Sequence, residues 1–287
     1  MKPARALRFS ALLSFVLMLV MNVLATTLPI NGQATNEVSD RYDTLFAPIG
    51  FTFAIWGVIY LLLGVYTVVQ FVADNELIRK ITPWFIASNL LNGLWIVAWH
   101  YEQLWVSTLI IVALLGTLVA INTKTTARRA TLGSTFAIRI PFAVYFGWVT
   151  VATVANISAA LVQAGLGDGF VLSAETWTIV ILVVAVGIGS TTALVNSSPT
   201  YALVLVWAFW GILSRHLSPT EWNQEYPSII VALQILLPLL GLVAVVALVR
   251  WFRQPVTRIF SAPFGRAGNT PQARAVPASP TSVRGCR

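Results

Sequence analysis

The chain has 287 residues, of which 57% are hydrophobic and only 10% are charged. A soluble domain carries about 25% charged residues, because its exterior has to be hydrated. The composition therefore excludes a soluble enzyme, a nucleic-acid-binding domain and a disordered protein, in spite of a net charge of +8. It predicts an all-α polytopic membrane protein.

Long stretches without charged residues define the expected helices. A helix needs about 20 apolar residues to cross the bilayer core. The stretch 176–214 is too long for one helix, and Asn196-Ser-Ser-Pro199 divides it with a turn signal. Eight helices are predicted, at 8–26, 50–73, 81–100, 103–123, 139–163, 175–195, 199–216 and 227–251. An alternative for the first is a cleaved signal peptide, because Val23-Leu24-Ala25 resembles a cleavage site.

Basic residues near the helix ends indicate the orientation, since Lys and Arg accumulate on the cytoplasmic side. With the N-terminus inside, Arg41 and Arg215 fall outside, whereas the inner segments hold Lys2, Arg5, Arg8, Arg79, Lys80, Lys124, Arg128, Arg129, Arg139, Arg250, Arg253, Arg258 and Arg266. We therefore expect a multi-pass protein of the cell (plasma or inner) membrane with both termini cytoplasmic.

Three segments are expected along the chain. Residues 1–165 form a five-helix bundle, and residues 166–252 add three transmembrane helices. Residues 253–287 are rich in Arg, Pro, Ala and Ser without apolar periodicity, which predicts a disordered basic cytoplasmic tail.

The side chains exclude several kinds of chemistry. All ten Asp and Glu residues lie in loops or at helix ends, whereas ion-coupled transporters usually carry carboxylates inside the membrane. Cys286 is the one cysteine and His100 and His216 are the two histidines, so no disulfide or multi-His metal site is expected. No nucleophile has a base beside it in the sequence, which argues against hydrolytic catalysis.

Tryptophan is unusually frequent, with eleven residues. Trp and Tyr at helix ends usually anchor a protein at the membrane interface. We assign this role to the tryptophans near predicted helix ends and to the neighbouring histidine, namely Trp84, Trp99, His100, Trp105, Trp177, Trp222 and Trp251.

Trp56, Trp95 and Trp148 lie deeper, and each belongs to a stripe at helical spacing that mixes rings with hydrogen-bonding groups. Such stripes are expected to face the bundle interior. Two interpretations remain open: the rings fill a packed core, or they line a cavity for a flat, largely apolar ligand. The stripes consist of Phe53, Trp56 and Tyr60; Ser88, Asn92 and Trp95; and Tyr145, Trp148, Ala152 and Asn156.

The loop between the first two helices, residues 27–49, is more than twenty residues long. Loops of this length are usually functional, and we expect this one to cover the cavity as a lid. Pro48 lies near its end.

Three motifs lie on the second, third and fifth predicted helices, namely Phe46-Ala-Pro-Ile-Gly-Phe-Thr-Phe-Ala-Ile-Trp56 with Tyr60, Leu91-Asn-Gly-Leu-Trp95, and Ile140-Pro-Phe-Ala-Val-Tyr145 followed by Trp148, Ala152 and Asn156. They resemble the motifs of the tryptophan-rich sensory protein family, also called TspO or translocator protein. The motifs follow in the family's order on the corresponding helices. The resemblance covers residues 1 to about 165, in an extended form with three additional helices.

The resemblance implies a membrane receptor or sensor that binds a porphyrin, or another flat hydrophobic molecule, below the first loop. By this analogy the ligand-binding residues are Pro48, Phe53, Trp56, Tyr60, Asn92, Trp95, Tyr145, Trp148 and Ala152. No cofactor is expected to be required beyond such a ligand, and the expected partners are a tetrapyrrole or hydrophobic small molecule and the bilayer, not nucleic acid. Some members of the family promote light-dependent porphyrin breakdown, so enzymatic activity stays open, although we lean against it.

The sequence also departs from the family. The family's first loop usually carries Trp-Tyr and Lys-Pro…Pro-Pro, of which Tyr42 and Pro48 remain, and the sterol motif after the fifth helix is absent. We therefore do not predict cholesterol transport. The added helices contain Trp207 and Trp210 but no evident site.

Three alternatives to a receptor remain. One is a transporter of a small amphipathic compound, although the added helices show no repeat of the three motifs. The others are an enzyme that acts on porphyrin through tryptophan radicals and a purely structural subunit.

Overall fold

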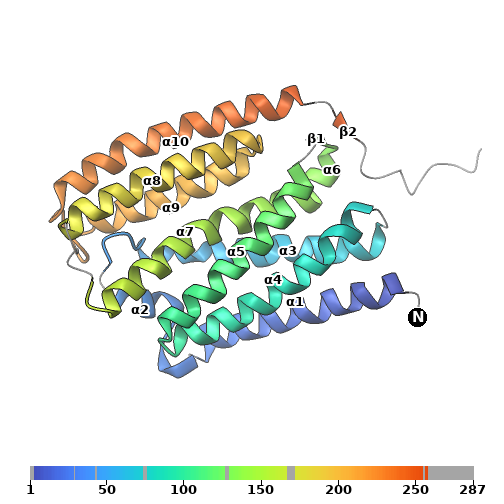
Figure 1. Cartoon of the computed structure of the whole chain (residues 1–287), viewed down its shortest axis with the longest axis horizontal. Helices are drawn as coiled ribbons and strands as arrows, with labels where there is room; N and C mark the ends of the chain where they lie inside the picture. Colours follow the sequence, from blue (N-terminus) through green and yellow to red (C-terminus); the bar gives the residue numbers. More distant parts are fainter. Residues whose placement is uncertain are drawn as a thin grey trace, which may run out of the picture.

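The structure is a computed structural model that describes residues 3–28, 30–42, 44–73, 76–126, 129–166, 172–254 and 256–257. Eight of its helices are long and apolar enough to cross a membrane (Figure 1), which confirms the predicted all-α polytopic membrane fold. Two of these spans, Gly50–Val72 and Leu132–Gln163, contain a short 3-10 or π turn, and two short elements lie in the first loop. The helical elements in chain order are α1 (Pro3–Thr27), η1 (Ile30–Gly32), α2 (Thr35–Asp40), η2 (Gly50–Ala54), α3 (Ile55–Val72), α4 (Glu76–His100), α5 (Leu104–Thr126), α6 (Leu132–Ser134), η3 (Thr135–Arg139), α7 (Ile140–Gln163), α8 (Ala174–Val195), α9 (Pro199–Leu217) and α10 (Pro227–Arg253).

The helix ends differ from the predicted ones mainly where charged residues continue a helix past its apolar segment. Helix α4 begins at Glu76 rather than at 81, and an ion pair of 2.7 Å between Glu76 and Lys80 spans its first turn. Helix α5 continues through Lys124 to Thr126. A charge-free stretch ends before such residues, whereas an exposed helix end accommodates them readily.

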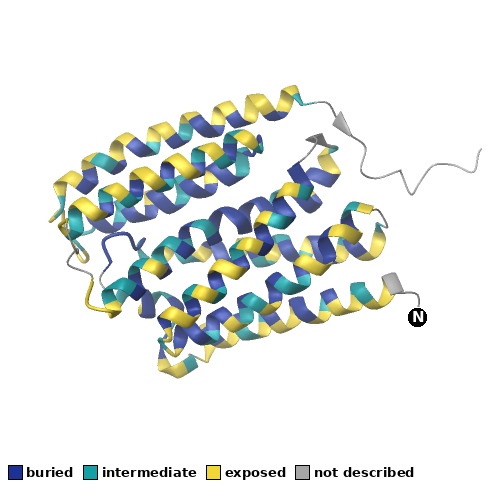
Figure 2. Ribbon diagram, in the orientation of Figure 1, coloured by how far each residue is buried: buried dark blue, intermediate teal, exposed yellow. Residues whose placement is uncertain are grey.

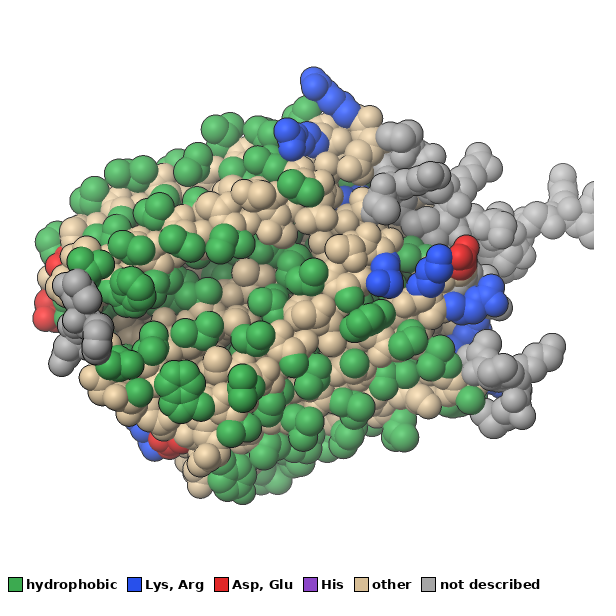
Figure 3. Space-filling model, viewed as in Figure 1, with side chains coloured by type: hydrophobic (Ala, Val, Ile, Leu, Met, Phe, Trp, Pro, Cys, Tyr) green, Lys and Arg blue, Asp and Glu red, His purple; other side chains and the backbone are tan. Residues whose placement is uncertain are grey.

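The outer surface is apolar between the two ends of the molecule. Leu61 on α3 exposes 75% of its surface and Leu109 on α5 exposes 73%, which a bilayer tolerates and water does not. Buried residues face inward on each helix (Figure 2). In the space-filling view, Lys and Arg gather at the end where α1 begins and α10 ends (Figure 3), which we call the basic end. The opposite end, which carries α2 and the first loop, is the loop end.

Helices α1, α3, α4, α5 and α7 form one group, and α8, α9 and α10 form a second group that packs on it through α9 and α7 (Figure 1). Gly147 permits this contact, because a Cβ atom there would lie 2.9 Å from the Cβ atom of Val204. Small residues allow such close approach of helices in membranes. Helix α7 is therefore enclosed on both sides, and residues 141–149 are all buried.

Arg139 joins the two groups at the basic end. It was predicted to be one of the basic residues that fix the topology, but it is buried and donates hydrogen bonds to the carbonyl oxygens of Asn196 and Ser197, at 2.6 and 3.0 Å. These carbonyls follow the last turn of α8, where the backbone lacks helical partners.

Two short strands lie beyond the helices at the basic end. Strand β1 (Arg129–Ala130) pairs in parallel with β2 (Val256–Thr257), just after α10. The predicted tail begins at 253, within the last turn of α10, and its residues from 258 onward lie outside the described part of the chain.

A glycine substitution tests the contact between the two groups. Gly147→Ala is expected to lower the stability of the fold by about 1–3 kcal/mol, because the added methyl overpacks the α7–α9 contact. Gly116→Ala on α5 is the control: no atom of the described residues lies within 4 Å of its added Cβ, and alanine favours a helix by up to about 1 kcal/mol. Thermal unfolding in detergent, followed by circular dichroism, distinguishes the two. Equal midpoints for both variants would contradict the close contact.

Candidate functional site

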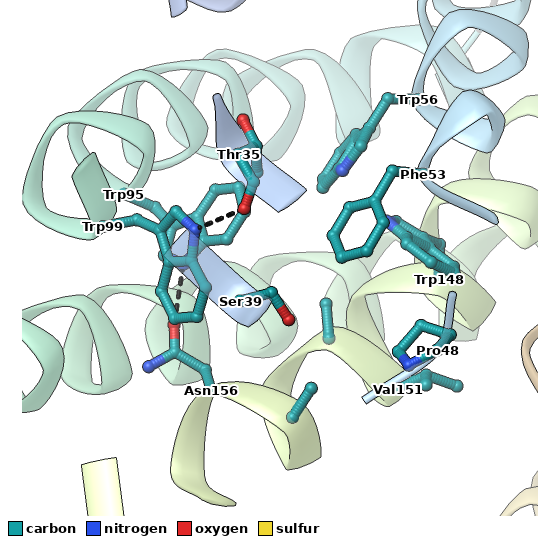
Figure 4. Close-up of a pocket in the computed structure, with 12 residues that line it drawn as sticks. Thr35, Ser39, Pro48, Phe53, Trp56, Trp95, Trp99, Trp148, Val151 and Asn156 are labelled. Atoms are coloured by element: carbon teal, nitrogen blue, oxygen red, sulfur yellow. Dashed lines mark hydrogen bonds between the residues drawn. The ribbon is translucent and has the colours of Figure 1, made fainter. Parts of the chain in front are cut away.

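A cavity lies at the loop end, between the first loop and helices α3, α4 and α7 (Figure 4). Thr35 and Ser39 of α2 and Pro48 form its roof. Its walls come mostly from aromatic and small side chains. The twelve lining residues are Thr35, Ser39, Pro48, Phe53, Trp56, Trp95, Trp99, Trp148, Val151, Ala152, Ala155 and Asn156.

Trp56 stands at the centre of the aromatic wall. Its ring centroid lies 5.7 Å from that of Trp95 and 6.3 Å from that of Trp148, with the Trp148 ring nearly perpendicular at 87°. Phe53 meets Trp148 edge to face at 5.8 Å, and Trp99 stacks on Trp95 at 6.1 Å. Each such pair contributes about 0.5–1.5 kcal/mol beyond area burial, so a ring that rotates away has to give up these contacts.

Asn156 fixes one side of the cavity. Its Oδ1 accepts a hydrogen bond of 2.9 Å from the Trp95 indole, and its Nδ2 donates to the hydroxyl of Thr108 at 2.8 Å. Ser107 exchanges hydrogen bonds with the same amide, at 2.9 and 3.1 Å. One asparagine of α7 thereby joins α4 and α5.

A second polar chain lies deeper in the bundle and joins four helices. The Tyr60 hydroxyl donates to Asn22 Oδ1 at 2.6 Å, Asn22 Nδ2 donates to Asn92 Oδ1 at 2.7 Å, and Asn92 Nδ2 donates to the Tyr145 hydroxyl at 3.0 Å. Buried polar groups need such partners where no water is available. Asn92 and Tyr145 are therefore interhelical links that do not line the cavity.

The nine predicted ligand-binding residues thus fall into three positions. Six line the cavity, Tyr60 lines a neighbouring groove, and Asn92 and Tyr145 lie in the chain beneath. Their contact with a ligand stays a prediction. The six are Pro48, Phe53, Trp56, Trp95, Trp148 and Ala152.

Sequence reasoning missed several lining residues. Thr35 and Ser39 have the i, i+4 spacing of a helix, and Glu37 accepts a hydrogen bond from the Ala34 amide at 2.7 Å, as in the first turn of a helix. This pattern could have revealed α2 within the loop. Val151 and Ala155 lie beside Ala152 and Asn156 on α7 and carry no signal of their own.

The Trp148 indole is the cavity's free donor. Trp148 is 2% exposed, and its Nε1 finds no hydrogen-bond partner within the described residues. A buried donor without a partner costs about 1–3 kcal/mol. In Figure 4 its nitrogen is directed toward Phe53 and the interior of the cavity. The site therefore offers this N–H to a molecule that brings an acceptor.

Trp99 and His100 were predicted as interfacial anchors, and the structure corrects this, because both are buried beneath the first loop. The Trp99 indole donates to the Thr35 carbonyl at 3.1 Å. The His100 carbonyl accepts hydrogen bonds of 3.0 Å from Asn31 and from Gln33. The end of α4 is thus a seat for the loop rather than a membrane contact.

Glu102 fastens the loop from the turn between α4 and α5. It forms an ion pair with Arg41, and it accepts hydrogen bonds from the Tyr42 hydroxyl at 2.7 Å and from Gln33 at 3.0 Å. The hydrogen bonds from Gln33 and Tyr42, with the charge of Arg41, lower the pKa of the Glu102 carboxyl against the opposing effect of burial. Burial and the bond to Glu102 raise the pKa of Tyr42 to about 12.

The free volume of the cavity is about 30 Å³, whereas a groove beside it, between α1 and α3, has about 360 Å³. Pockets for drug-sized ligands measure about 300–1,000 Å³. The two spaces share Thr35, Phe53 and Trp56, so these side chains stand between them. The groove is lined by Asn22, Val23, Thr26, Thr35, Asn36, Phe53, Ala54, Trp56, Gly57, Tyr60 and Ile96.

The pH dependence of the loop tests the role of Glu102. A carboxyl with a lowered pKa stabilises the closed loop above the ordinary glutamate pKa of about 4.3 and loses this contribution as the pH falls through its own, lower pKa. Hydrogen exchange of residues 31–42 should therefore be slow near neutral pH. It should accelerate once the pH falls below the lowered pKa of Glu102, after correction for the intrinsic pH dependence of exchange. Glu102→Gln should exchange fast at neutral pH already. Glu225→Gln, in another loop, is the control. Identical exchange in both variants would contradict the role of Glu102 in holding the first loop closed.

No curated protein and no solved structure matches the chain significantly. A family comparison matches residues 8–247 to the family described as TSPO-like protein. The motifs reach only to about residue 165, whereas this match continues through α8, α9 and most of α10. The chain therefore belongs to the TSPO-like protein family.

Proposed function

We propose that this multi-pass membrane protein is a receptor or sensor that binds a porphyrin, or a similarly flat hydrophobic molecule, between the aromatic walls beneath the first loop. Family membership supports a membrane sensor or binding protein in general. The observation that carries the finer proposal is the buried, unpartnered indole N–H of Trp148 in a cavity walled by four tryptophans, as far as the described residues show.

The walls suit a flat ligand. Trp56 and Trp95 present ring faces inclined by 33°, and Trp148 meets Trp56 nearly at a right angle. A flat apolar ring gains area burial and offset stacking against such faces. An acceptor on the ligand, such as a carboxylate or a ring nitrogen, then receives the Trp148 N–H. The hydroxyls of Thr35 and Ser39 supply further polar contacts from the roof.

A ligand of porphyrin size needs more space than the cavity alone provides. Rotation of the Trp56 side chain would join the cavity to the groove between α1 and α3, and the joint volume then reaches the range of ligand pockets. Asn36 and Thr26 of the groove would meet polar substituents of the ligand near the loop end. Trp56 acts in this proposal as the movable wall.

Transport of a small amphipathic compound is the second candidate, and the open groove beside α1 favours it. The charges argue against ion-coupled transport, because Asp and Glu of the described helices lie in their terminal turns or outside the eight spans. We therefore place binding first. For orientation, we propose the cell membrane with the basic end toward the cytoplasm, since Lys and Arg gather there.

A protoporphyrin titration in detergent tests the proposal, with binding followed by porphyrin absorbance so that the number of tryptophans does not affect the signal. Wild type should bind saturably. Trp148→Phe should weaken binding by up to about tenfold, because it removes one hydrogen-bond donor. Trp56→Phe should weaken it as well, through lost stacking area. Trp105→Phe is the matched control, since this side chain is 53% exposed at the start of α5.

Two results would overturn the proposal. An absence of saturable binding by wild type would mean that the rings are core packing. Equal affinities in all four proteins would place the porphyrin elsewhere on the molecule.

A further inference from the structure

Helix α9 runs beside the roof of the cavity and contacts the adjoining segments at three successive turns. The Trp207 indole donates to the carbonyl oxygen of Thr52 at 3.0 Å, and the Ile49 amide donates to the carbonyl oxygen of Gly211 at 3.2 Å. The contacts from Trp207, Gly211 and Arg215 are spaced four residues apart, so they lie on one face of α9.

The third of these contacts is an ion pair made by a buried arginine. Arg215 is 3% exposed and lies 3.1 Å from the carboxylate of Asp40, at the end of α2, and 3.3 Å from that of Glu221. The adjacent His216 is fully buried, and its Nε2 lies within hydrogen-bond distance, 3.0 Å, of the Leu45 carbonyl. The Arg215 side chain is buried whereas both carboxylates are partly exposed, so loss of a carboxylate would leave a buried guanidinium with one partner fewer. This end of α9 is therefore an attachment point for the first loop.

In the sequence, the residues that α9 contacts are direct neighbours of residues that line the cavity. Asp40, Ile49 and Thr52 are held by α9, and their immediate neighbours Ser39, Pro48 and Phe53 line the cavity. On the wall side, α9 touches α7 at Gly147, the residue before Trp148. Roof and wall are thus both set by a helix that contributes no lining residue of its own.

We propose that α9 is a positioning helix for the ligand site: through Trp207, Gly211, Arg215 and His216 it fixes the roof, and thereby the affinity for the flat ligand. This inference rests on the proposed function and extends it to the second helix group. It assigns α9, one of the three helices beyond residue 165, a role in binding, although this helix lies outside the cavity.

Gly211 offers the sharpest test, because a Cβ atom there would collide with the side chain of Thr52. The two nearest colliding atoms are Oγ1 and Cγ2 of Thr52, and Thr52→Ala removes both. The Thr52 hydroxyl is buried and has no hydrogen-bond partner among the described residues, so its removal breaks no bond. Gly211→Ala therefore displaces the roof, and the added Thr52→Ala relieves most of the collision, because only the Cβ atom of residue 52, 3.0 Å away, stays close.

The experiment compares wild type, Gly211→Ala, Thr52→Ala, the double variant, and Gly187→Ala in full-length protein in detergent. Gly187 is the matched control on α8, where no atom of the described chain lies within 4 Å of the added Cβ. Two quantities are measured: protoporphyrin affinity, and hydrogen exchange of residues 44–54 without ligand. Gly211→Ala should weaken binding by roughly tenfold, the scale expected of overpacking strain, and should accelerate exchange. The double variant should regain most of both properties, and Thr52→Ala and Gly187→Ala should resemble wild type.

Each other outcome has a defined meaning. Unchanged exchange or unchanged affinity in Gly211→Ala would overturn the positioning role. A loss that the double variant does not regain would overturn it too, because the effect would then be general destabilisation. If wild type fails to bind protoporphyrin, the proposed function fails, and the exchange data alone decide whether α9 holds the roof.

Discussion

Hydrogen bonds from asparagine side chains hold the helices around the cavity. Lipid tails are as apolar as leucine, so helices gain little from burying apolar surface against each other, and polar links between them carry more weight. Asn156 joins α4, α5 and α7, and the Asn22–Asn92 pair joins α1 to α4 and both to the tyrosines of α3 and α7. With these partners in place, Trp148 is left as the buried donor of the described cavity lining that has none. The donor that the site offers to a ligand is therefore the indole that these links leave without a partner.

Much of the fold could be predicted from the sequence, because a bilayer imposes a simple rule. A segment that crosses it must be helical, long and nearly free of charge. The eight helices follow from this rule, as does the turn at Asn196. Helical spacing also brought Trp56, Trp95 and Trp148 to the interior, and the structure places all three on one cavity. Helix ends were less predictable, since charged residues such as Glu76 belong to a helix without belonging to its apolar segment.

The rest depends on contacts between segments far apart in the chain. Asn92 and Tyr145 share their helical stripes with cavity residues, yet they hydrogen-bond to each other beneath the cavity. Helical spacing is the same for a side chain that lines the cavity and for one that links two helices, so it does not distinguish them. Trp99 lies at a helix end like an interfacial anchor, but the first loop folds over it. The contact of α9 with this loop has no local sequence signal either, because the hydrogen-bond partners of Trp207 and Gly211 are Thr52 and Ile49, more than 150 residues earlier.

Light-driven oxidation of the porphyrin-loaded protein tests the central claim most directly. Illuminated protoporphyrin converts dissolved O2 into singlet oxygen, which adds first to the tryptophans nearest the ligand, and peptide mass spectrometry maps the modified tryptophans. If the ligand lies between the aromatic walls, Trp56 and Trp148 are oxidised first, although they are 8% and 2% exposed. Oxidation led instead by Trp105, Trp177 and Trp210, which are 53%, 46% and 45% exposed, would contradict a ligand in this cavity.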